Sequence, residues 1–138
     1  MILSAAFCLD RPLTASGRSS VIVVRLGSPK VFVGVLDLNE ANWQPIVHSD
    51  RLVLVTFWAP WCGPCRHLHP TIETLNQHFG RKILFARINV DENPQICSQM
   101  DVHTIPQMIL FHAGRECGRL IGLQSEQVIT RMLYRILE

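Results

Sequence analysis

The sequence predicts an α/β fold in which a central mixed β-sheet, largely parallel with a C-terminal hairpin, is flanked by helices on both faces. From residue 31 onward, stretches with the two-residue period of a strand alternate with stretches that have a helical period. The apolar run at 51–58 is typical of a strand that is buried on both faces. A turn signal at 112–115 predicts an antiparallel hairpin late in the chain. The expected order of elements is β-α-β-α-β-α-β-β-α.

The first elements precede a long helix. Residues 31–38 are apolar and β-branched, which predicts a strand. Asn39 is suited to cap a helix that runs to about His48, because its apolar side chains recur three and four positions apart. The apolar run at 51–58 follows as the central strand.

The long helix is expected over residues 62–79, where apolar side chains again form one stripe. Pro70 should kink this helix, because a proline in a helix interior lacks the N–H donor and clashes with the preceding turn. Gly80 is a suitable terminator.

The second half of the chain supplies the remaining elements. Residues 82–90 predict another buried strand, and the pair at 93–94 (Asn-Pro) predicts the start of a short helix. Segments 107–111 and 116–121 form the expected hairpin, and Ser125 can cap the last helix. The apolar face of that helix is expected to comprise Val128, Met132, Leu133, Ile136 and Leu137.

The composition limits the classes of protein to which the chain can belong. Its 138 residues are about one domain's worth. With 48% hydrophobic and 17% charged residues, the sequence does not have the composition of a disordered protein. Its apolar runs are far shorter than the roughly 20 residues of a membrane-spanning helix. A net charge of +2 is too weak for a dedicated nucleic-acid surface, so we expect neither a membrane nor a nucleic-acid partner.

Residues 1–30 are expected to form an N-terminal extension to a domain at 31–138. They carry four basic side chains against one acidic side chain, together with five serines and several prolines and glycines. This composition fits an organelle transit segment, for example for the mitochondrion. It fits as well a flexible arm or an over-extended start on a cytoplasmic protein, which is the location we expect.

The motif that can carry out chemistry is Cys62-Gly63-Pro64-Cys65, where the central strand ends and the long helix begins. The first N–H groups of a helix lack intrahelical partners, and together with the positive end of the helix dipole they favour a thiolate at Cys62. The thiolate is the attacking species in thiol–disulfide exchange, so Cys62 is the expected nucleophile. Cys65 is the expected resolving thiol, which attacks the mixed disulfide and releases the reduced partner, while Gly63 and Pro64 stiffen the turn.

Other uses of the cysteine pair fit less well. Cys62, Cys65, His67 and His69 lie within eight residues, but one helix cannot direct His67 and Cys65 at the same ion, so no metal site is expected. Covalent haem attachment needs a histidine directly after the second cysteine, where Arg66 stands. A disulfide across so short a loop constrains little of the unfolded chain. We therefore expect redox chemistry at a Cys62–Cys65 disulfide, with no cofactor.

The segment at 57–66, FWAPWCGPCR, resembles the active-site segment of the thioredoxin family. The resemblance covers about residues 33–138 in family order, through Pro70, the region at 89–94, Thr104-Ile105-Pro106, Gly114 and Gly122. The combination of WCGPC with a later Ile-Pro pair is a highly specific signal. The resemblance implies a thioredoxin fold and a monomeric dithiol reductant of disulfide-containing target proteins, recharged by a thioredoxin reductase.

The family resemblance also assigns roles around the cysteines. It implies that the peptide bond between Ile105 and Pro106 is cis and faces the nucleophile, where the backbone pairs with an extended substrate segment. Gly122 would leave room for the partner's backbone, and Trp61 would give an apolar platform beside the sulfur. Trp58 is expected to pack under the active site.

Three positions depart from the family pattern near the cysteines. Thr56 stands where the family usually has a buried aspartate that helps to take the proton from the second cysteine. Arg87, usually a lysine near that acid, has lost its expected partner and should extend to water. His69 lies four residues after Cys65 on the same helical face. One hypothesis makes His69 the base for Cys65, and the alternative is a packed histidine without a role.

Other departures leave the reaction class unchanged. Gln107 replaces the threonine that usually follows the cis proline, which puts the substrate range in question. Cys97 and Cys117 are expected to be small core residues, and Cys8 is a candidate for adventitious oxidation. Two alternatives to a general reductase stay open: a pathway-specific redox protein or oxidant, and a binding module that uses the groove without catalysis.

Overall fold

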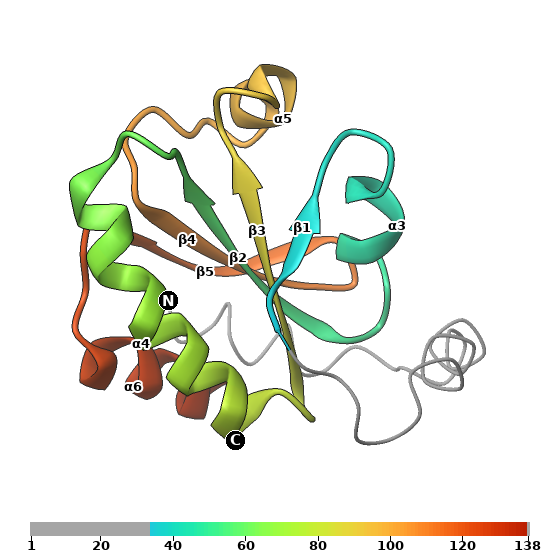
Figure 1. Cartoon of the computed structure of the whole chain (residues 1–138). Helices are drawn as coiled ribbons and strands as arrows, with labels where there is room; N and C mark the ends of the chain where they lie inside the picture. Colours follow the sequence, from blue (N-terminus) through green and yellow to red (C-terminus); the bar gives the residue numbers. More distant parts are fainter. Residues whose placement is uncertain (1–33, 138) are drawn as a thin grey trace.

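The computed structural model describes residues 34–137. The predicted extension at 1–30, which includes Cys8, and the first residues of the predicted strand at 31–38 lie outside this range. In chain order the elements are β1 (Leu36–Leu38), α3 (Trp43–Val47), β2 (Leu52–Trp58), α4 (Gly63–Phe79), β3 (Ile83–Asn89), α5 (Pro94–Gln99), β4 (Gln107–His112), β5 (Arg115–Ile121) and α6 (Glu126–Leu137) (Figure 1). The predicted order of strands and helices is confirmed.

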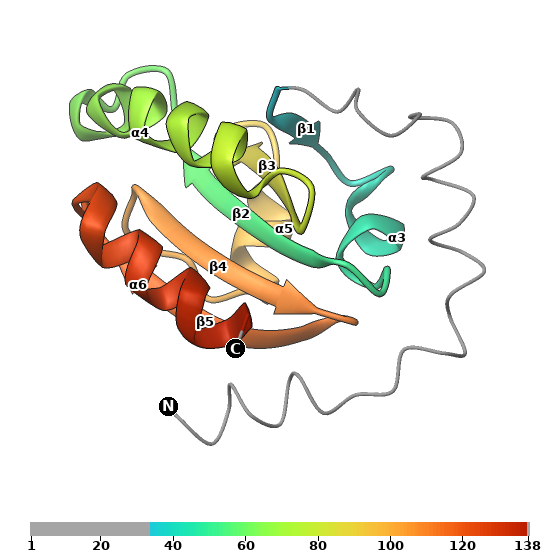
Figure 2. The same cartoon turned by 90° about the horizontal axis from the view of Figure 1, so that it is seen from below.

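The five strands form one mixed sheet in the order β1-β3-β2-β4-β5. Strand β3 pairs in parallel with β1 and β2, whereas β4 pairs antiparallel with β2 and β5. Helices α4 and α6 cover one face of the sheet, and α3 and α5 cover the other (Figures 1 and 2). The sheet therefore has the predicted parallel part and C-terminal hairpin.

Strand β2 divides the interior into two cores. Its side chains alternate in direction, so Leu52 and Leu54 pack with α4 and α6, while Val53 and Val55 pack on the opposite side with α3 and α5. The first six residues of β2 are buried. Because β2 is central and leads directly into α4, the turn that carries the cysteines is fixed to the best-packed part of the sheet.

Two helices differ in detail from the sequence-based expectation. Helix α3 begins at Trp43, because the side chain of Asn39 accepts the N–H groups of Ala41 and Asn42 in a turn rather than capping the helix. On α6, Ile129 is fully buried, although it was not among the expected core residues. Ser125 caps α6 as expected, because its Oγ accepts the N–H of Val128 at 3.2 Å.

Helix α4 ends at the predicted place for a different reason. Gly80 follows the last helical residue but keeps right-handed angles, with φ of −60°. Its N–H donates to the carbonyl of Asn76 at 2.8 Å, so the left-handed conformation that favours glycine is not used here. Pro70 lies inside the helix, and the kink expected there stays a prediction.

Candidate redox site

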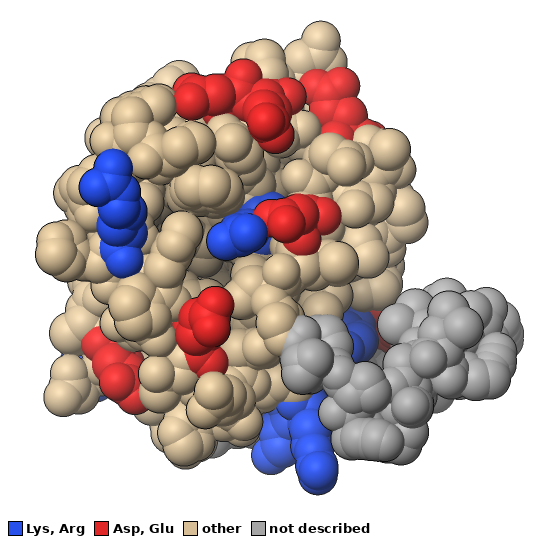
Figure 3. Space-filling model, in the orientation of Figure 1, with Lys and Arg blue, Asp and Glu red and all other residues tan. Residues whose placement is uncertain are grey.

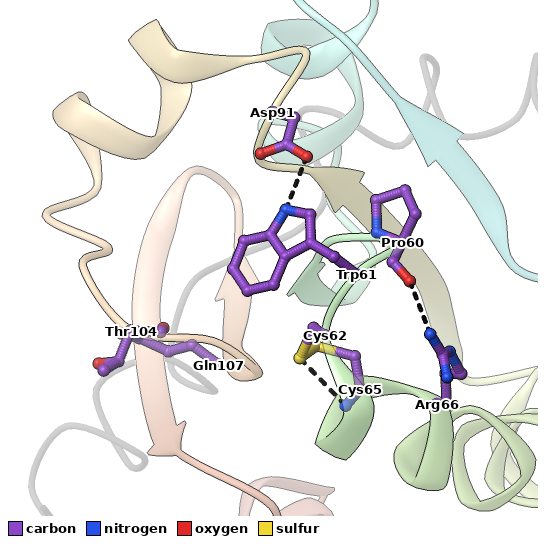
Figure 4. Close-up of a disulfide and its surroundings, with 8 residues drawn as sticks. All are labelled: Pro60, Trp61, Cys62, Cys65, Arg66, Asp91, Thr104 and Gln107. Atoms are coloured by element: carbon purple, nitrogen blue, oxygen red, sulfur yellow. Dashed lines mark hydrogen bonds between the residues drawn. A yellow bond between two sulfur atoms is a disulfide. The ribbon is translucent and has the colours of Figure 1, made fainter.

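Cys62 and Cys65 form a disulfide at the start of α4, with Cα atoms 5.3 Å apart (Figure 4). Cys62 is the N-cap residue and has extended backbone angles, whereas Cys65 lies within the first helical turn. Pro64 occupies an early helical position, where its missing N–H costs no hydrogen bond. The predicted strand-to-helix junction thus holds both sulfur atoms.

The first turn of α4 directs hydrogen-bonding capacity at one of the two sulfur atoms. The N–H of Cys65 donates to Sγ of Cys62 at 3.2 Å. No acidic side chain lies in the first helical turn to offset the positive end of the helix dipole. Cys62 retains 5% of its surface and Cys65 only 1%. The two cysteines therefore differ both in hydrogen bonding and in access from solvent.

Trp61 is the most exposed large apolar residue of the described chain, with 66% of its surface accessible. Its indole Nε1–H donates to Oδ2 of Asp91 at 2.9 Å, which fixes the ring beside the cysteine turn (Figure 4). The sequence analysis expected Trp61 beside the sulfur and gave Asp91 no role. The signal for Asp91 is long-range, since thirty positions separate the two residues.

The loop before β4 brings a second wall to the site. The peptide bond between Ile105 and Pro106 is cis, as the family resemblance implied. Ile105 packs against the small cluster that contains both cysteines. Gly122 has φ of +89° and donates its N–H to the carbonyl of Pro106 at 2.8 Å. No atom lies within 4 Å of where a Cβ on Gly122 would stand, so the surface there is open.

Arg119 is a residue that sequence reasoning missed. Its guanidinium donates to Oε1 of the buried Gln107 at 2.8 Å and to the carbonyl of Met100 at 2.9 Å, and it pairs with Glu116. The hydrogen bond to Glu116 is the largest cause that raises the pKa of Arg119. Gln107 in turn donates to the carbonyl of Thr104 at 3.0 Å. This network fixes the loop before β4. Thr104 and Gln107, at the end of that loop, are drawn with the disulfide in Figure 4.

Beneath the cysteines, Thr56 and Arg87 lie side by side on β2 and β3. The expectation that Arg87 lacks a partner is wrong, because its Nε donates to Oδ1 of Asp37 at 2.6 Å across the β1–β3 pairing. The guanidinium carbon also lies 5.1 Å from the ring centre of Trp58, within cation–π range. Trp58 is half-buried under the site, as expected. A replacement acid from the edge strand therefore neutralises Arg87.

His69 lies on α4 one turn after Cys65 and is half-buried. Its ring meets Trp58 edge-on, with centroids 5.3 Å apart. Burial lowers the pKa of His69 below its ordinary value, the positive charge of Arg87 lowers it further, and Glu73 opposes the change. The imidazole is therefore neutral at neutral pH, a form that can accept a proton.

The remaining cysteines of the described chain lie in the interior. Cys97 and Cys117 retain 9% and 5% of their surface, and Cys97 is a small core residue as expected. Burial raises the pKa of the Cys97 thiol, which keeps it protonated and unreactive at neutral pH. Within residues 34–137, no three His, Cys, Asp or Glu side chains are grouped so that they could hold a metal ion.

Two further features of the described residues are the charges on one face and the apolar character of the helices. On the face in Figure 3, acidic side chains gather along the upper edge, and near the centre a basic side chain lies against an acidic one. Of the helices within 34–137, none combines the length and apolar character needed to cross a bilayer.

Comparison with known proteins agrees with this geometry. The thioredoxin family model matches residues 34–135. A thioredoxin of Alicyclobacillus acidocaldarius subsp. acidocaldarius is 41% identical over 103 residues, which cover 75% of this chain and 98% of that protein. The chloroplastic thioredoxin M4 of Arabidopsis thaliana is 37% identical over 106 residues, 76% of this chain and 55% of its own length.

A solved structure gives the same answer for the fold. The crystal structure of thioredoxin from Trypanosoma brucei brucei aligns with a TM-score of 0.71 at 28% identity and covers 75% of this chain and 91% of that one. Family, fold and a cysteine pair at disulfide distance agree with one another. The chain belongs to the thioredoxin family, and it is a thiol–disulfide oxidoreductase whose redox-active pair is Cys62 and Cys65.

Proposed function

We propose that this protein reduces disulfides of other proteins, with Cys62 as the attacking and Cys65 as the resolving residue. The Cys62 thiolate attacks one sulfur of the target disulfide, forms a mixed disulfide and releases the first target thiolate, which takes up a proton from solvent. Cys65 loses its proton and attacks Sγ of Cys62, which releases the second target thiolate. The target gains two electrons and two protons, and the Cys62–Cys65 disulfide forms.

The observation that carries this assignment is the asymmetry of the two sulfur atoms. A hydrogen bond from the N–H of Cys65 and the N-terminal end of α4 both favour negative charge at Sγ of Cys62. Cys65 is nearly inaccessible, so foreign disulfides meet Cys62 first. Because Cys62 is the more accessible sulfur, the mixed disulfide forms on Cys62 first, and Cys65 attacks it afterwards.

We assign target binding to the surface around the disulfide. Trp61 supplies an exposed apolar face, and the open space at Gly122 leaves room for a backbone. The segment at Ile105 and Pro106 lies against the cysteine cluster, where an extended target strand can hydrogen bond to the main chain. Gly63 and Pro64 complete the exposed turn.

The partners follow from the family. Members of the thioredoxin family act on disulfide targets and are themselves reduced by a thioredoxin reductase, and need no cofactor. We propose the same donor for this chain, with the domain at 31–138 acting as a monomer and residues 1–30 as a separate extension. A dithiol reductant needs a reducing compartment, so we place its action in the cytoplasm.

Reduction of insulin by dithiothreitol, followed as turbidity, tests the activity. Catalytic amounts of the wild-type protein should accelerate the reaction, and Cys62→Ser should return the rate to background. Cys65→Ser should instead accumulate a covalent complex with the target, visible by mass spectrometry. Cys97→Ala is the matched control and should retain activity. If insulin is reduced at the uncatalysed rate in the presence of the wild-type protein, the proposed activity is wrong and the alternative of a non-catalytic binding module is supported.

The direction of the reaction is tested by equilibration with glutathione. A reductant should remain oxidised in mixtures of reduced and oxidised glutathione that fully reduce a disulfide oxidant, because its disulfide has the more negative potential. A pair that glutathione reduces readily would identify an oxidant instead.

A further inference from the structure

A small cavity of about 20 Å³ lies between the sheet and helix α4. Its walls come from three elements and from the segment before β1: Val35, Thr56, His69, Ile72, Glu73 and Arg87. A volume of roughly 10–15 Å³ suffices for one water molecule. The cavity has both apolar and polar walls, and a water site needs polar partners.

Two polar atoms at this cavity are buried and have no hydrogen-bond partner among the protein atoms of residues 34–137. They are Oγ1 of Thr56 and Nε2 of His69. Thr56 retains only 3% of its surface. An unsatisfied buried polar atom destabilises the folded state, so one water shared by both atoms would satisfy both. The hydroxyl of Thr56 can donate or accept, which suits either form of the imidazole.

One residue that lines the cavity, His69, is also a helical neighbour of the less accessible cysteine. His69 follows Cys65 by four residues on α4, so the two side chains lie on one helical face as neighbours. Because Cys65 has only 1% of its surface exposed, bulk water has little access to its proton. The proton must therefore pass to a group inside the protein before Cys65 can attack.

The charged groups around His69 leave few alternatives as acceptors. Arg87 of β3 carries a permanent positive charge and cannot accept a proton. Asp37 of β1 lies on the solvent side of that arginine, with 70% of its side chain exposed. Glu73 is on an exposed position of α4, one turn beyond His69. Among these groups, His69 alone is both half-buried and one turn from Cys65.

We propose that His69 accepts the proton of Cys65 in the step that releases the reduced target, and that Thr56 and one water in the cavity hold its ring in place. This role rests on the proposed function, since it concerns the second half of the same reaction. The lowered pKa of His69 supports it, because the imidazole is neutral and able to accept a proton at neutral pH.

The Sγ–H bond of Cys65 breaks and its proton moves to the imidazole of His69. The resulting thiolate attacks Sγ of Cys62, which forms the Cys62–Cys65 bond and breaks the bond between Cys62 and the target sulfur. The target leaves as a thiolate with the electron pair of the broken bond. The imidazolium then returns its proton to solvent.

Stopped-flow reaction of the reduced full-length protein with 5,5′-dithiobis(2-nitrobenzoate) separates the two halves. Attack by Cys62 releases one coloured thionitrobenzoate at a rate that depends on reagent concentration. Attack by Cys65 on the mixed disulfide releases a second one at a rate independent of reagent concentration. Cys65→Ser should lack the concentration-independent phase.

His69→Gln should slow the second phase about tenfold at neutral pH and leave the first phase unchanged. In the wild-type protein the second-phase rate should fall as the pH decreases through the lowered pKa of His69, where the imidazole becomes protonated. In His69→Gln this acidic limb should disappear, and the rate should rise toward alkaline pH with ionisation of the thiol itself. Thr56→Val should slow the second phase by about two- to fivefold and keep the wild-type shape of the pH profile.

His78→Gln is the matched control, an exposed histidine at the other end of α4. A second phase in His69→Gln with the rate and pH profile of this control would overturn the proposal. If Thr56→Val has the second-phase rate of the wild-type protein, Thr56 and the water take no part in positioning His69. An absent first phase in the wild-type protein would contradict the proposed function instead.

A measurement without a variant guards against a folding defect in His69→Gln. NMR titration of the wild-type protein should give His69 a pKa below the ordinary value of histidine. An ordinary pKa for His69, with the imidazole largely protonated where the second phase is still fast, would overturn the proposal.

Discussion

Nη1 of Arg119 lies 2.8 Å from Oε1 of Gln107, so that a charged residue in the middle of β5 fixes the first residue of β4. The same guanidinium reaches the carbonyl of Met100 at 2.9 Å. The segment between Met100 and Gln107 contains the cis Ile105–Pro106 peptide bond, and Ile105 packs against the cysteine cluster. Arg119 on β5 therefore holds the loop between Met100 and Gln107, which forms one side of the site.

Replacing Arg119 by lysine should loosen this wall. A lysine keeps the charge but cannot donate to Gln107, Met100 and Glu116 together, so we expect a loss of about 1 kcal/mol in the free energy of unfolding. The KM for a disulfide target should rise about two- to fivefold with little change in kcat, because the loop is less well ordered before binding. Urea unfolding and target titration measure both effects. The exposed Arg131→Lys on α6 should change neither value.

Removing the exposed indole of Trp61 should weaken target binding more than folding. With 66% of the residue already in solvent, Trp61→Ala should alter the free energy of unfolding by no more than about 0.5 kcal/mol. Its KM for insulin should rise about three- to tenfold through the lost apolar face. Tyr134→Ala, an exposed aromatic on α6, should leave KM unchanged. Equal KM values for the two variants would contradict the assignment of Trp61 to the binding surface.

The charges around His69 should move its pKa in opposite directions. Arg87→Gln removes a positive charge that disfavours the imidazolium, so the pKa of His69 should rise, yet stay below its ordinary value because burial remains the largest cause. Glu73→Gln removes the opposing negative charge and should lower the pKa further. NMR titration of the imidazole resonances follows both changes. Shifts of the same sign in the two variants would be incompatible with this electrostatic arrangement.

The same histidine should make folding stability depend on pH. The folded state holds the pKa of His69 below that of the unfolded chain, so the unfolded state binds the proton more readily. Stability should be fully present above about pH 6.5 and should decrease as the pH falls through the folded-state pKa. Urea unfolding at several pH values should show a steeper loss for the wild-type protein than for His69→Gln. Parallel curves for the two proteins would argue against the lowered pKa.

The packing of α6 on the sheet should depend on Ile129, a buried residue that the sequence analysis did not place in the core. Ile129→Ala deletes a fully buried side chain and should cost about 2–4 kcal/mol of unfolding free energy. Val128→Ala, at a half-buried position beside it, should cost about 1 kcal/mol or less. Thermal or urea unfolding compares the two variants. A smaller loss for Ile129→Ala than for Val128→Ala would mean that α6 packs through another face.

The elements and the cysteine motif were predictable because their signals are local. Alternating and helical periods place β2, α4 and the hairpin from short windows of sequence. Ionisation at Cys62 follows from its place at a helix start, which the same windows define. Errors arose at element ends, where Asn39 forms a turn instead of a cap, and on α6, where two neighbouring apolar stripes compete to face the sheet.

The amino-acid sequence by itself thus determined the class of fold, the redox motif and the identity of the two reacting sulfur atoms. Only the tertiary structure decided that Asp37 neutralises Arg87, that Arg119 holds Gln107, and that Thr56 and His69 share a cavity. These pairs are joined by the strand order β1-β3-β2-β4-β5 and by the packing of α4 on the sheet. Periodicity shows which side of an element is buried, whereas the partner across the sheet depends on long-range pairing.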